Sequence, residues 1–199
     1  MRVAWMLLAA LAAQGCSEPA PPPIAVRKPV LDAGDFAVMK GVLDHRLRPR
    51  GGNSARFLVV DTTMATCAAP GVLQRAPGAC LDSQWMEFVS PMLPKGSLRT
   101  ATLDFQARNA RRLAIEPALG AGVTYISATV TDFMSSEELV RWQPPGSTVV
   151  MFSTPSYPAA RMAVIAYAAG SDIRGAARLE RQSDGQWMVT GHSQYGTVE

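Results

Sequence analysis

The side chains that could carry out acid–base or metal chemistry are few in this chain and lie far apart. His45 and His192 are the only histidines. A nucleophilic triad needs a histidine that a third group orients, and zinc needs three or four nitrogen, sulfur or oxygen ligands at suitable spacing. His45 lies beside Asp44, but nothing in the sequence brings both a nucleophile and an acid to either histidine. The G-x-S-x-G, P-loop and G-x-G-x-x-G motifs are absent. The sequence therefore predicts no catalytic residues, no metal site and no cofactor.

One acidic residue and two hydroxyls, Asp61-Thr62-Thr63, directly follow the apolar run at 56–60. Such residues at the carboxyl end of a strand can hold a metal or a phosphate in open α/β sheets. Phosphatases of the haloacid-dehalogenase type place their nucleophile there, but they need a second aspartate where this chain has Thr63. We exclude that family and expect Asp61 and Thr62 to form a turn, with their side chains bonded to nearby backbone.

The reactive residue with the most informative surroundings is Cys16. The apolar run at 3–13 has the length of an export signal and is shorter than the ~20 residues that span a bilayer. Ala13-Gln14-Gly15-Cys16 resembles the bacterial lipobox, in which small residues precede a cysteine that receives a diacylglyceryl group, although the lipobox usually has leucine in place of Ala13. The resemblance implies a signal peptide at 1–15 and lipid attachment at Cys16. Ordinary signal cleavage near Ala12 or Ala13 is the alternative.

Proline is concentrated in the segment that follows, and residues 16–30 are interpreted as a tether. Proline-rich chains are extended and semi-rigid, so they hold a domain at a distance from its anchor. We expect residues 31–199 to form one domain, anchored by lipid to a bacterial membrane and facing the periplasm.

The other two cysteines, Cys67 and Cys80, form an even pair once Cys16 is set aside. In an oxidising compartment such a pair is expected to form a disulfide. Closing a loop of this length is worth about 3 kcal/mol in the chain-entropy interpretation. A metal or redox pair is the competing interpretation, but the spacing differs from C-x-x-C and the loop contains no histidine.

The hydrophobic spacing predicts an α+β fold in a single domain, with N-terminal helices and a C-terminal four-stranded antiparallel meander. Asp32 is expected to cap the first helix, at 32–47. Asp184-Gly185 marks a hairpin turn. The other expected helices are 82–89, 102–113 and 135–142, the expected strands are 56–60, 123–130, 148–153, 161–168, 176–182 and 186–192, and a turn is expected at 155–160.

Composition and charge give little support for nucleic acid as a partner. The formal net charge is only +3, and charged residues make up 18% of the chain. A nucleic-acid binder is expected to show a basic face with interleaved aromatics. Arg46, Arg48 and Arg50 do cluster near the end of the first helix. They form either a phospholipid or anionic-polymer contact or, more simply, a solvated helix end where cations offset the helix dipole.

The order of segments resembles a group of small bacterial envelope proteins with no assigned activity. The resemblance is carried by DFAVMKGVLDHRL, RFLVVDTT, LDFQARN, VMFSTPSYPAARMAVIAY and ARLERQSDGQWMV. It implies a location and a fold class, and it supplies no catalytic residues.

The leading functional hypothesis is a non-enzymatic envelope module, held to the membrane by its N-terminal lipid. It would bind an envelope protein, a cell-wall polymer or a small ligand. The alternative is a secreted hydrolase whose site is assembled from sequence-distant residues, with Asp61, Asp104, Glu116 and His192 as candidates. A fold that gathers two or more of these in one cleft would favour the hydrolase. A chaperone-like or toxin-immunity module is a third possibility.

Overall fold

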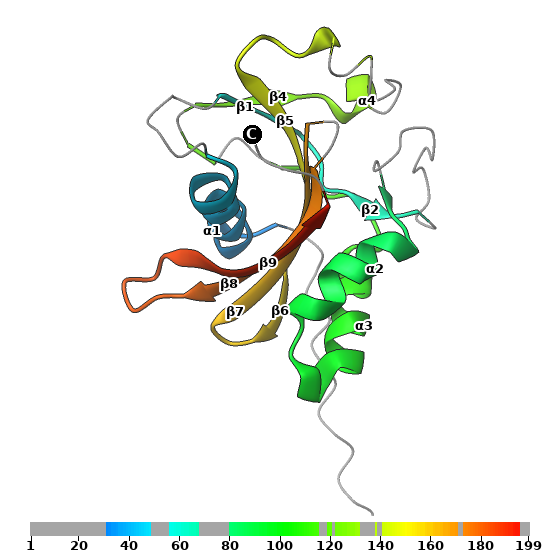
Figure 1. The fold of residues 1–199 in the computed structure, drawn as a ribbon, viewed down its shortest axis with the longest axis vertical. Coiled ribbons are helices and arrows are strands. Elements are labelled where there is room, and N and C mark those ends of the chain that lie inside the picture. The colour runs from blue at the N-terminus through cyan, green and yellow to red at the C-terminus, as the bar shows by residue number, and fades with distance from the viewer. Residues whose placement is uncertain are drawn as a thin grey trace, which may run out of the picture.

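A computed structural model describes residues 31–48, 56–67, 80–115, 119–120, 122–131, 138, 141–170 and 173–195. Within these residues the chain forms an α+β fold around one mixed, seven-stranded sheet with helices on both faces (Figure 1). The predicted signal peptide, tether and lipid-attachment cysteine lie outside the described residues.

The N-terminal helix is the first element, and it begins where the sequence predicts. Helix α1 (Ala33–Val42) continues into the π-helical turn η1 (Leu43–Leu47). The Asp32 carboxylate accepts the Asp35 N–H, and the Asp35 carboxylate accepts the Asp32 N–H in return, both at 3.0 Å. This reciprocal capping box satisfies backbone donors that the first turn would otherwise leave unpaired.

The remaining helices pack on the opposite face of the sheet from α1 (Figure 1). Asp82 caps α2 (Ser83–Val89) through the N–H groups of Gln84 and Trp85. The 3₁₀ turns η2 (Ser90–Met92) and η3 (Lys95–Ser97) lead into α3 (Leu98–Arg108). Helix α3 therefore lies several residues earlier than the predicted 102–113. None of the described helices has the length and apolar character to cross a membrane.

The sheet differs from the prediction in its topology. Its strands are β1 (Arg56–Val60), β4 (Val123–Ile126), β5 (Ser147–Phe152), β6 (Ser156–Ala159), β7 (Met162–Ala169), β8 (Ile173–Arg181) and β9 (Trp187–Tyr195). They run in the order β4-β1-β5-β7-β8-β9, and β6 pairs with β7. Strand β1 is parallel to both β4 and β5. The pairs β5–β7, β7–β8 and β8–β9 are antiparallel.

The prediction of a four-stranded antiparallel meander as the sheet is therefore wrong. The four C-terminal strands are neighbours, but β5 also pairs with β1 and extends the sheet into a parallel half. The predicted turn at 155–160 contains β6. The predicted strand at 123–130 ends at Ile126, and α4 (Ala128–Thr131) follows. These errors share a cause, because the identity of a strand's partner is set by contacts that are distant in sequence. Most of the predicted helix at 135–142 lies outside the described residues.

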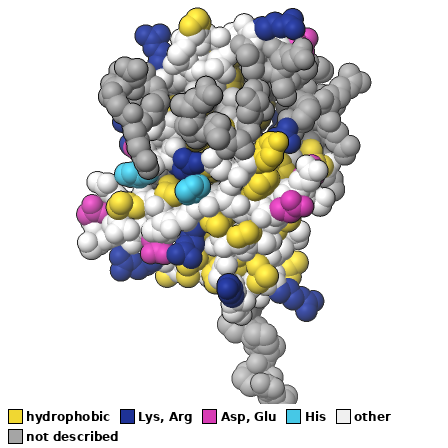
Figure 2. Space-filling model, viewed as in Figure 1, with side chains coloured by type: hydrophobic (Ala, Val, Ile, Leu, Met, Phe, Trp, Pro, Cys, Tyr) yellow, Lys and Arg dark blue, Asp and Glu magenta, His cyan; other side chains and the backbone are white. Residues whose placement is uncertain are grey.

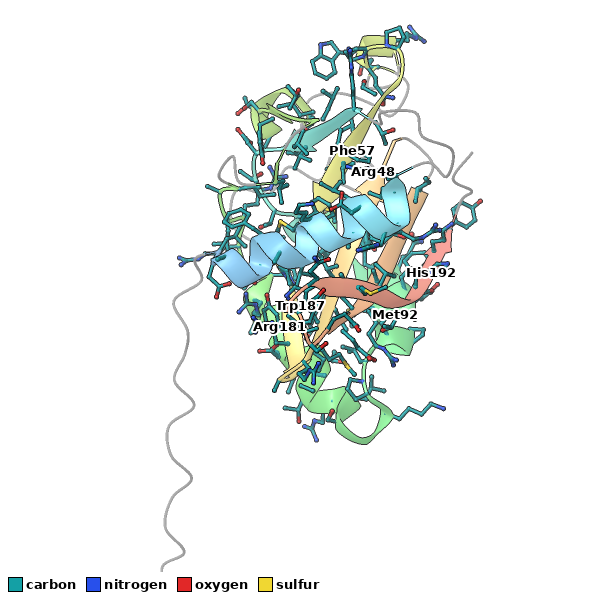
Figure 3. All side chains as sticks on the ribbon, turned by 90° about the vertical axis from the view of Figure 1, so that its left-hand side faces the viewer. Arg48, Phe57, Met92, Arg181, Trp187 and His192 are labelled. Carbon is teal, nitrogen blue, oxygen red and sulfur yellow. A yellow bond between two sulfur atoms is a disulfide. The ribbon has the colours of Figure 1, made fainter. Side chains whose placement is uncertain are left out.

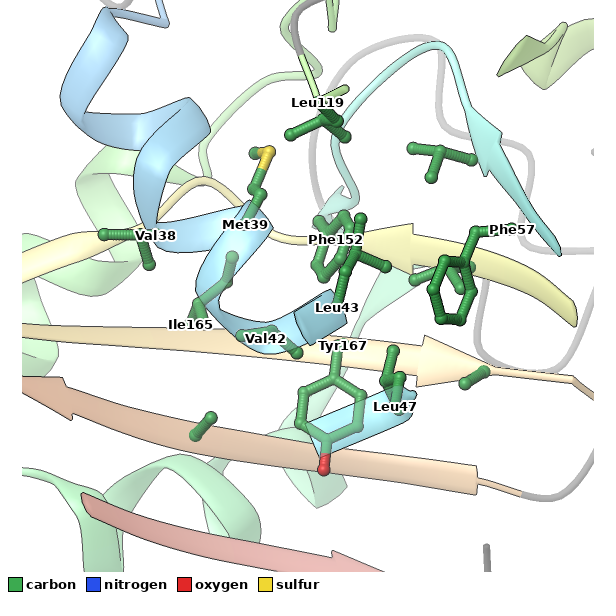
Figure 4. Packing of buried hydrophobic residues seen from close by; sticks show 14 of the residues in the cluster. Val38, Met39, Val42, Leu43, Leu47, Phe57, Leu119, Phe152, Ile165 and Tyr167 are labelled. Carbon is green, nitrogen blue, oxygen red and sulfur yellow. The ribbon is translucent and has the colours of Figure 1, made fainter. Parts of the chain in front are cut away.

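Two apolar layers cover the two faces of the sheet. On one face, Val38, Met39 and Val42 of α1 pack against side chains of β5 and β7 that include Phe152 and Ile165 (Figure 4). On the other face, helices α2 and α3 bury Trp85, Val89 and Phe105 against Val164 and Ala166. Strand β7 is therefore covered on both sides, as its continuous apolar run predicts.

The predicted disulfide between Cys67 and Cys80 is confirmed. Its Cα atoms are 4.9 Å apart. Cys80 begins β3 (Cys80–Leu81), which pairs in parallel with β2 (Ala65–Thr66), the strand directly before Cys67. The bond ties the chain after β1 to the start of the α2 region.

Candidate functional site

The residues that the sequence offers for a hydrolase do not come together. Asp61 follows β1, whereas His192 lies on β9, with β5, β7 and β8 between them. Four strand spacings of ~4.8 Å separate the two strands by about 19 Å. Asp104 is exposed on α3, and Glu116 lies outside the described residues. No hydrogen bond or ion pair joins Asp61, Asp104 and His192 in the described part of the chain, so these residues do not form a catalytic set.

Asp61 has a structural role at the carboxyl edge of the parallel strands. Its Oδ1 accepts the Ala128 N–H at 2.9 Å, and its carbonyl oxygen accepts the Ile115 N–H at 2.7 Å. Asp61 does bond to backbone, but the predicted nearby partner is wrong, because Ala128 lies 67 residues away in the sequence. This bond holds the N–H of Ala128, the first residue of α4, just after β4 ends at Ile126.

The rest of that edge is filled by the chain itself. Asn109 is fully buried, donates to the Phe105 and Thr154 carbonyl oxygens at 2.8 and 3.1 Å, and accepts the Thr154 N–H at 2.7 Å. The Thr63 hydroxyl accepts the Leu113 N–H at 3.0 Å. Buried polar groups satisfied in this way stabilise a fold and are not available to a ligand. Among the described residues no three His, Cys, Asp or Glu side chains lie close enough together to hold a metal ion.

A second polar cluster joins α1 to α3 and β6. The Asp35 carboxylate is completely buried, and one Arg108 amino nitrogen, Nη2, donates to its two oxygens at 2.9 and 3.1 Å. The Tyr157 hydroxyl donates to the same carboxylate at 2.8 Å, and the Arg108 guanidinium lies 5.3 Å from the Tyr157 ring centroid. Burial raises the pKa of Asp35, and Arg108 opposes that rise. Burial and the neighbouring Asp35 raise the pKa of Tyr157. The charges are paired internally, so this cluster acts as a clamp.

The third cluster is different, because it contains a cation and no acid. We define the Arg46 cluster as Arg46, Tyr167, His192 and Gln194. Nη2 of Arg46 donates to Oε1 of Gln194, and the Tyr167 hydroxyl donates to the same oxygen at 3.3 Å. The Nε of Arg46 is buried and has no partner among the described residues. The nearby Asp44 is already bound to Lys40 and to Arg48.

Sheet register builds this cluster on the α1 face. Tyr167 pairs with Gly175, and Gly175 pairs with Gln194, so the three positions form one row across β7, β8 and β9. A Cβ at Gly175 would lie 2.5 Å from the Ser193 carbonyl oxygen and 2.9 Å from the Gln194 Cβ. Glycine therefore allows the Gln194 side chain to reach the Tyr167 hydroxyl.

The electrostatics of the cluster are those of a donor site. His192 is exposed, and its pKa is lowered by partial burial and by the Arg46 charge. Burial raises the pKa of the Tyr167 hydroxyl, against the influence of Arg46, so this phenol remains a hydrogen-bond donor at neutral pH. Figure 3 shows His192 on β9, which passes alongside the helix formed by α1 and η1. In Figure 2 the two histidines of the chain lie on one face, next to Lys or Arg side-chain atoms.

The sequence singles out part of this cluster for other reasons. Arg46 is noted as one of three clustered arginines, and His192 as a candidate base. Tyr167 and Gln194 are missed, because only the strand register places them beside Arg46. A polar residue at the inward position of an otherwise apolar strand is the one available signal, and Tyr167 provides it.

Comparison with known proteins identifies no relative. No protein-family model matches the chain, and neither a curated protein nor a solved structure matches it. The assignment of function therefore depends on the residues of this chain alone.

Proposed function

We propose that this protein is an exported lipoprotein of a bacterial cell envelope that acts as a non-enzymatic binding module. Its N-terminal lipid on Cys16 would anchor it to a membrane, and the folded domain would face the periplasm. Its partner would be an envelope protein, a cell-wall polymer or a small ligand rather than a nucleic acid, and it would need no cofactor.

The observation that carries the proposal is the Cys67–Cys80 disulfide. Disulfides persist in oxidising compartments and are rare in the cytosol, so the bond supports export. It also uses two of the three cysteines, which leaves Cys16 outside the pair, directly after an export-type apolar run. The Arg46 cluster supports the binding part of the proposal, because it offers donors but no acid–base pair.

Intact mass tests the anchor. The full chain is produced in a bacterium with its own signal, extracted from membranes and analysed whole. We expect a chain that begins at Cys16 and carries a diacyl or triacyl addition. The control is Cys16→Ser, which should leave the membrane fraction while keeping the disulfide. An unmodified chain that begins near residue 13 or 14 would contradict the proposal.

A further inference from the structure

We propose that the Arg46 cluster is a binding site for one oxyanion, the carboxylate or phosphate group of an envelope ligand. Arg46 supplies the charge, and its guanidinium together with the His192 ring supplies donors. Gln194, which accepts hydrogen bonds from the Tyr167 hydroxyl and the Arg46 guanidinium, holds the guanidinium in place. This inference deepens the proposed function, and it rests on that function for the compartment in which the ligand is met.

The first argument is that none of the described residues supplies a counter-ion to Arg46. Arg46 is half-buried, and the partner that the structure gives its guanidinium is the neutral amide oxygen of Gln194. Removing a cation from water is unfavourable unless an opposite charge or enough acceptors replace the lost hydration. Its Nε is buried with no acceptor among the described residues, a property shared by the Nε of Arg108 and of Arg112, so the missing counter-ion carries the argument. A bound anion would supply the missing charge.

A comparison with the other arginines strengthens this point. Arg108, whose side chain is 19% exposed, has the Asp35 carboxylate at 2.9 Å. Arg48 is half-exposed and has Asp44 at 3.0 Å. Arg178 has Glu180 at 3.1 Å. In each of these pairs the fold provides an acid, and at Arg46 it provides an amide.

The second argument is that the site is held in place. Gln194 is fixed by the register of β8 and β9, and it anchors Arg46 across a sequence separation of 148 residues. Helix α1 is held against β9 by the close approach of Gly41, where an added Cβ would lie 2.8 Å from the Trp187 carbonyl oxygen. Donors that are positioned before a ligand arrives bind it at a lower entropic cost.

The chemistry of the donors selects the ligand class. A guanidinium is a planar fork of N–H donors that matches carboxylate and phosphate oxygens. A neutral imidazole can donate one N–H to the same group and can also become charged beside it. The site contains no described carboxylate that would attract a metal or an amine.

The His192 ring reports on binding. Arg46 lowers the pKa of His192, so an anion that neutralises the Arg46 charge should raise it. The experiment follows histidine ring signals by nuclear magnetic resonance on the full chain, purified as the cell processes it, and His192→Asn identifies the His192 signal. Inorganic phosphate is titrated at constant ionic strength against chloride. We expect a saturable shift and a rise in the pKa of His192.

Two variants that each lose one positive charge distinguish phosphate binding at the Arg46 cluster from a general effect of the net charge. Arg46→Gln should weaken phosphate binding at least about tenfold, the loss expected for one charge-assisted hydrogen bond. Arg48→Gln is the matched control, because Arg48 lies two residues away, is half-exposed and pairs with Asp44. It should bind within about twofold of the unmodified protein. Equal binding by both variants, or no saturable response in any protein, would overturn the proposal.

A third variant covers the case in which Arg46→Gln does not fold. Gln194→Glu places a carboxylate on the oxygen position that Arg46 already contacts, so Arg46 gains a permanent counter-ion. We expect a folded protein in which phosphate binds at least about tenfold more weakly and no longer changes the pKa of His192. Gln194→Glu that still binds phosphate as the unmodified protein does would refute the site.

Parallel titrations identify the source of the oxyanion. Acetate represents a carboxylate, inorganic phosphate a free phosphate, and glycerol 1-phosphate a lipid headgroup. The source is assigned to whichever of the three anions binds most tightly and loses affinity in Arg46→Gln. These titrations do not require Cys16, so binding without lipid attachment rejects only the anchor, and lipid attachment without binding rejects only this site.

Discussion

Replacing Arg108 with methionine gives the most demanding test of the energetics. The Asp35 carboxylate is completely buried, and the Arg108 side chain is only 19% exposed. Arg108→Met preserves much of the apolar stem and removes the charge, which leaves Asp35 buried without its cation. Breaking a buried ion pair on one side costs about 3–5 kcal/mol in the free energy of unfolding. Because Arg108 retains some contact with water, we expect the lower end, about 3 kcal/mol at pH 7.

The pH dependence of this loss shows whether it is electrostatic. Burial raises the folded-state pKa of Asp35 above its ordinary value of 3.8. Stability from the protonated carboxyl is therefore fully present below pH 3.8 and is lost as the pH rises through the folded pKa. Arg108 lowers the pKa of Asp35, so in Arg108→Met the pKa of Asp35 rises further. The decrease in the free energy of unfolding with rising pH therefore continues to a higher pH in Arg108→Met than in the unmodified protein. The cost of Arg108→Met should shrink as the solution is made more acidic.

Urea unfolding of both proteins from pH 7 to pH 4 measures the difference directly. The matched control is the double variant Asp35→Asn with Arg108→Met, in which no buried charge remains. It should recover most of the loss at pH 7 and show little change in the difference with pH. A loss that is the same at pH 4 and pH 7, or that the double variant does not reduce, would refute the assignment of Asp35 and Arg108 as a buried charge pair.

Two further predictions concern the disulfide and the packing of α1. Thiol labelling of the denatured, unreduced protein should leave Cys67 and Cys80 unmodified, and reduction should lower the free energy of unfolding by about 3 kcal/mol. Labelling at either cysteine before reduction would disprove the bond. Gly41→Ala should cost about 1–3 kcal/mol in thermal or urea unfolding, because its Cβ would lie 2.8 Å from the Trp187 carbonyl oxygen. Gly96→Ala is its control, since nothing lies within 4 Å of the added Cβ, and an equal loss there would show that the contact with β9 is not the cause.

Local interactions explain the parts of the fold that the sequence predicts well. Asp32 caps the first helix as expected, and Asp82 caps α2 in the same way, because a capping carboxylate bonds N–H groups two or three residues away. Asp184-Gly185 forms the predicted turn between β8 and β9, with Gly185 at a φ of 85°. Each of these features is decided within a few residues.

The strands that pair with β1 cannot be predicted from local sequence. Its apolar run identifies a buried strand, and four of its five residues are buried. Nothing in that run specifies that β4 and β5 flank it in parallel, since these partners lie tens of residues later in the chain. Parallel neighbours require a crossover, so their choice depends on how the intervening helices pack.

The functional clusters follow the same division. By itself the sequence determined the chemical types that are present: an apolar N-terminal run, an even pair of cysteines after Cys16, two separated histidines and an arginine group at the end of the first helix. Only the tertiary structure decided that Arg108 receives a buried carboxylate while Arg46 receives the amide of Gln194. The reason is physical. Charge type is a property of one residue, whereas the presence of a counter-ion depends on which strands and helices pack together.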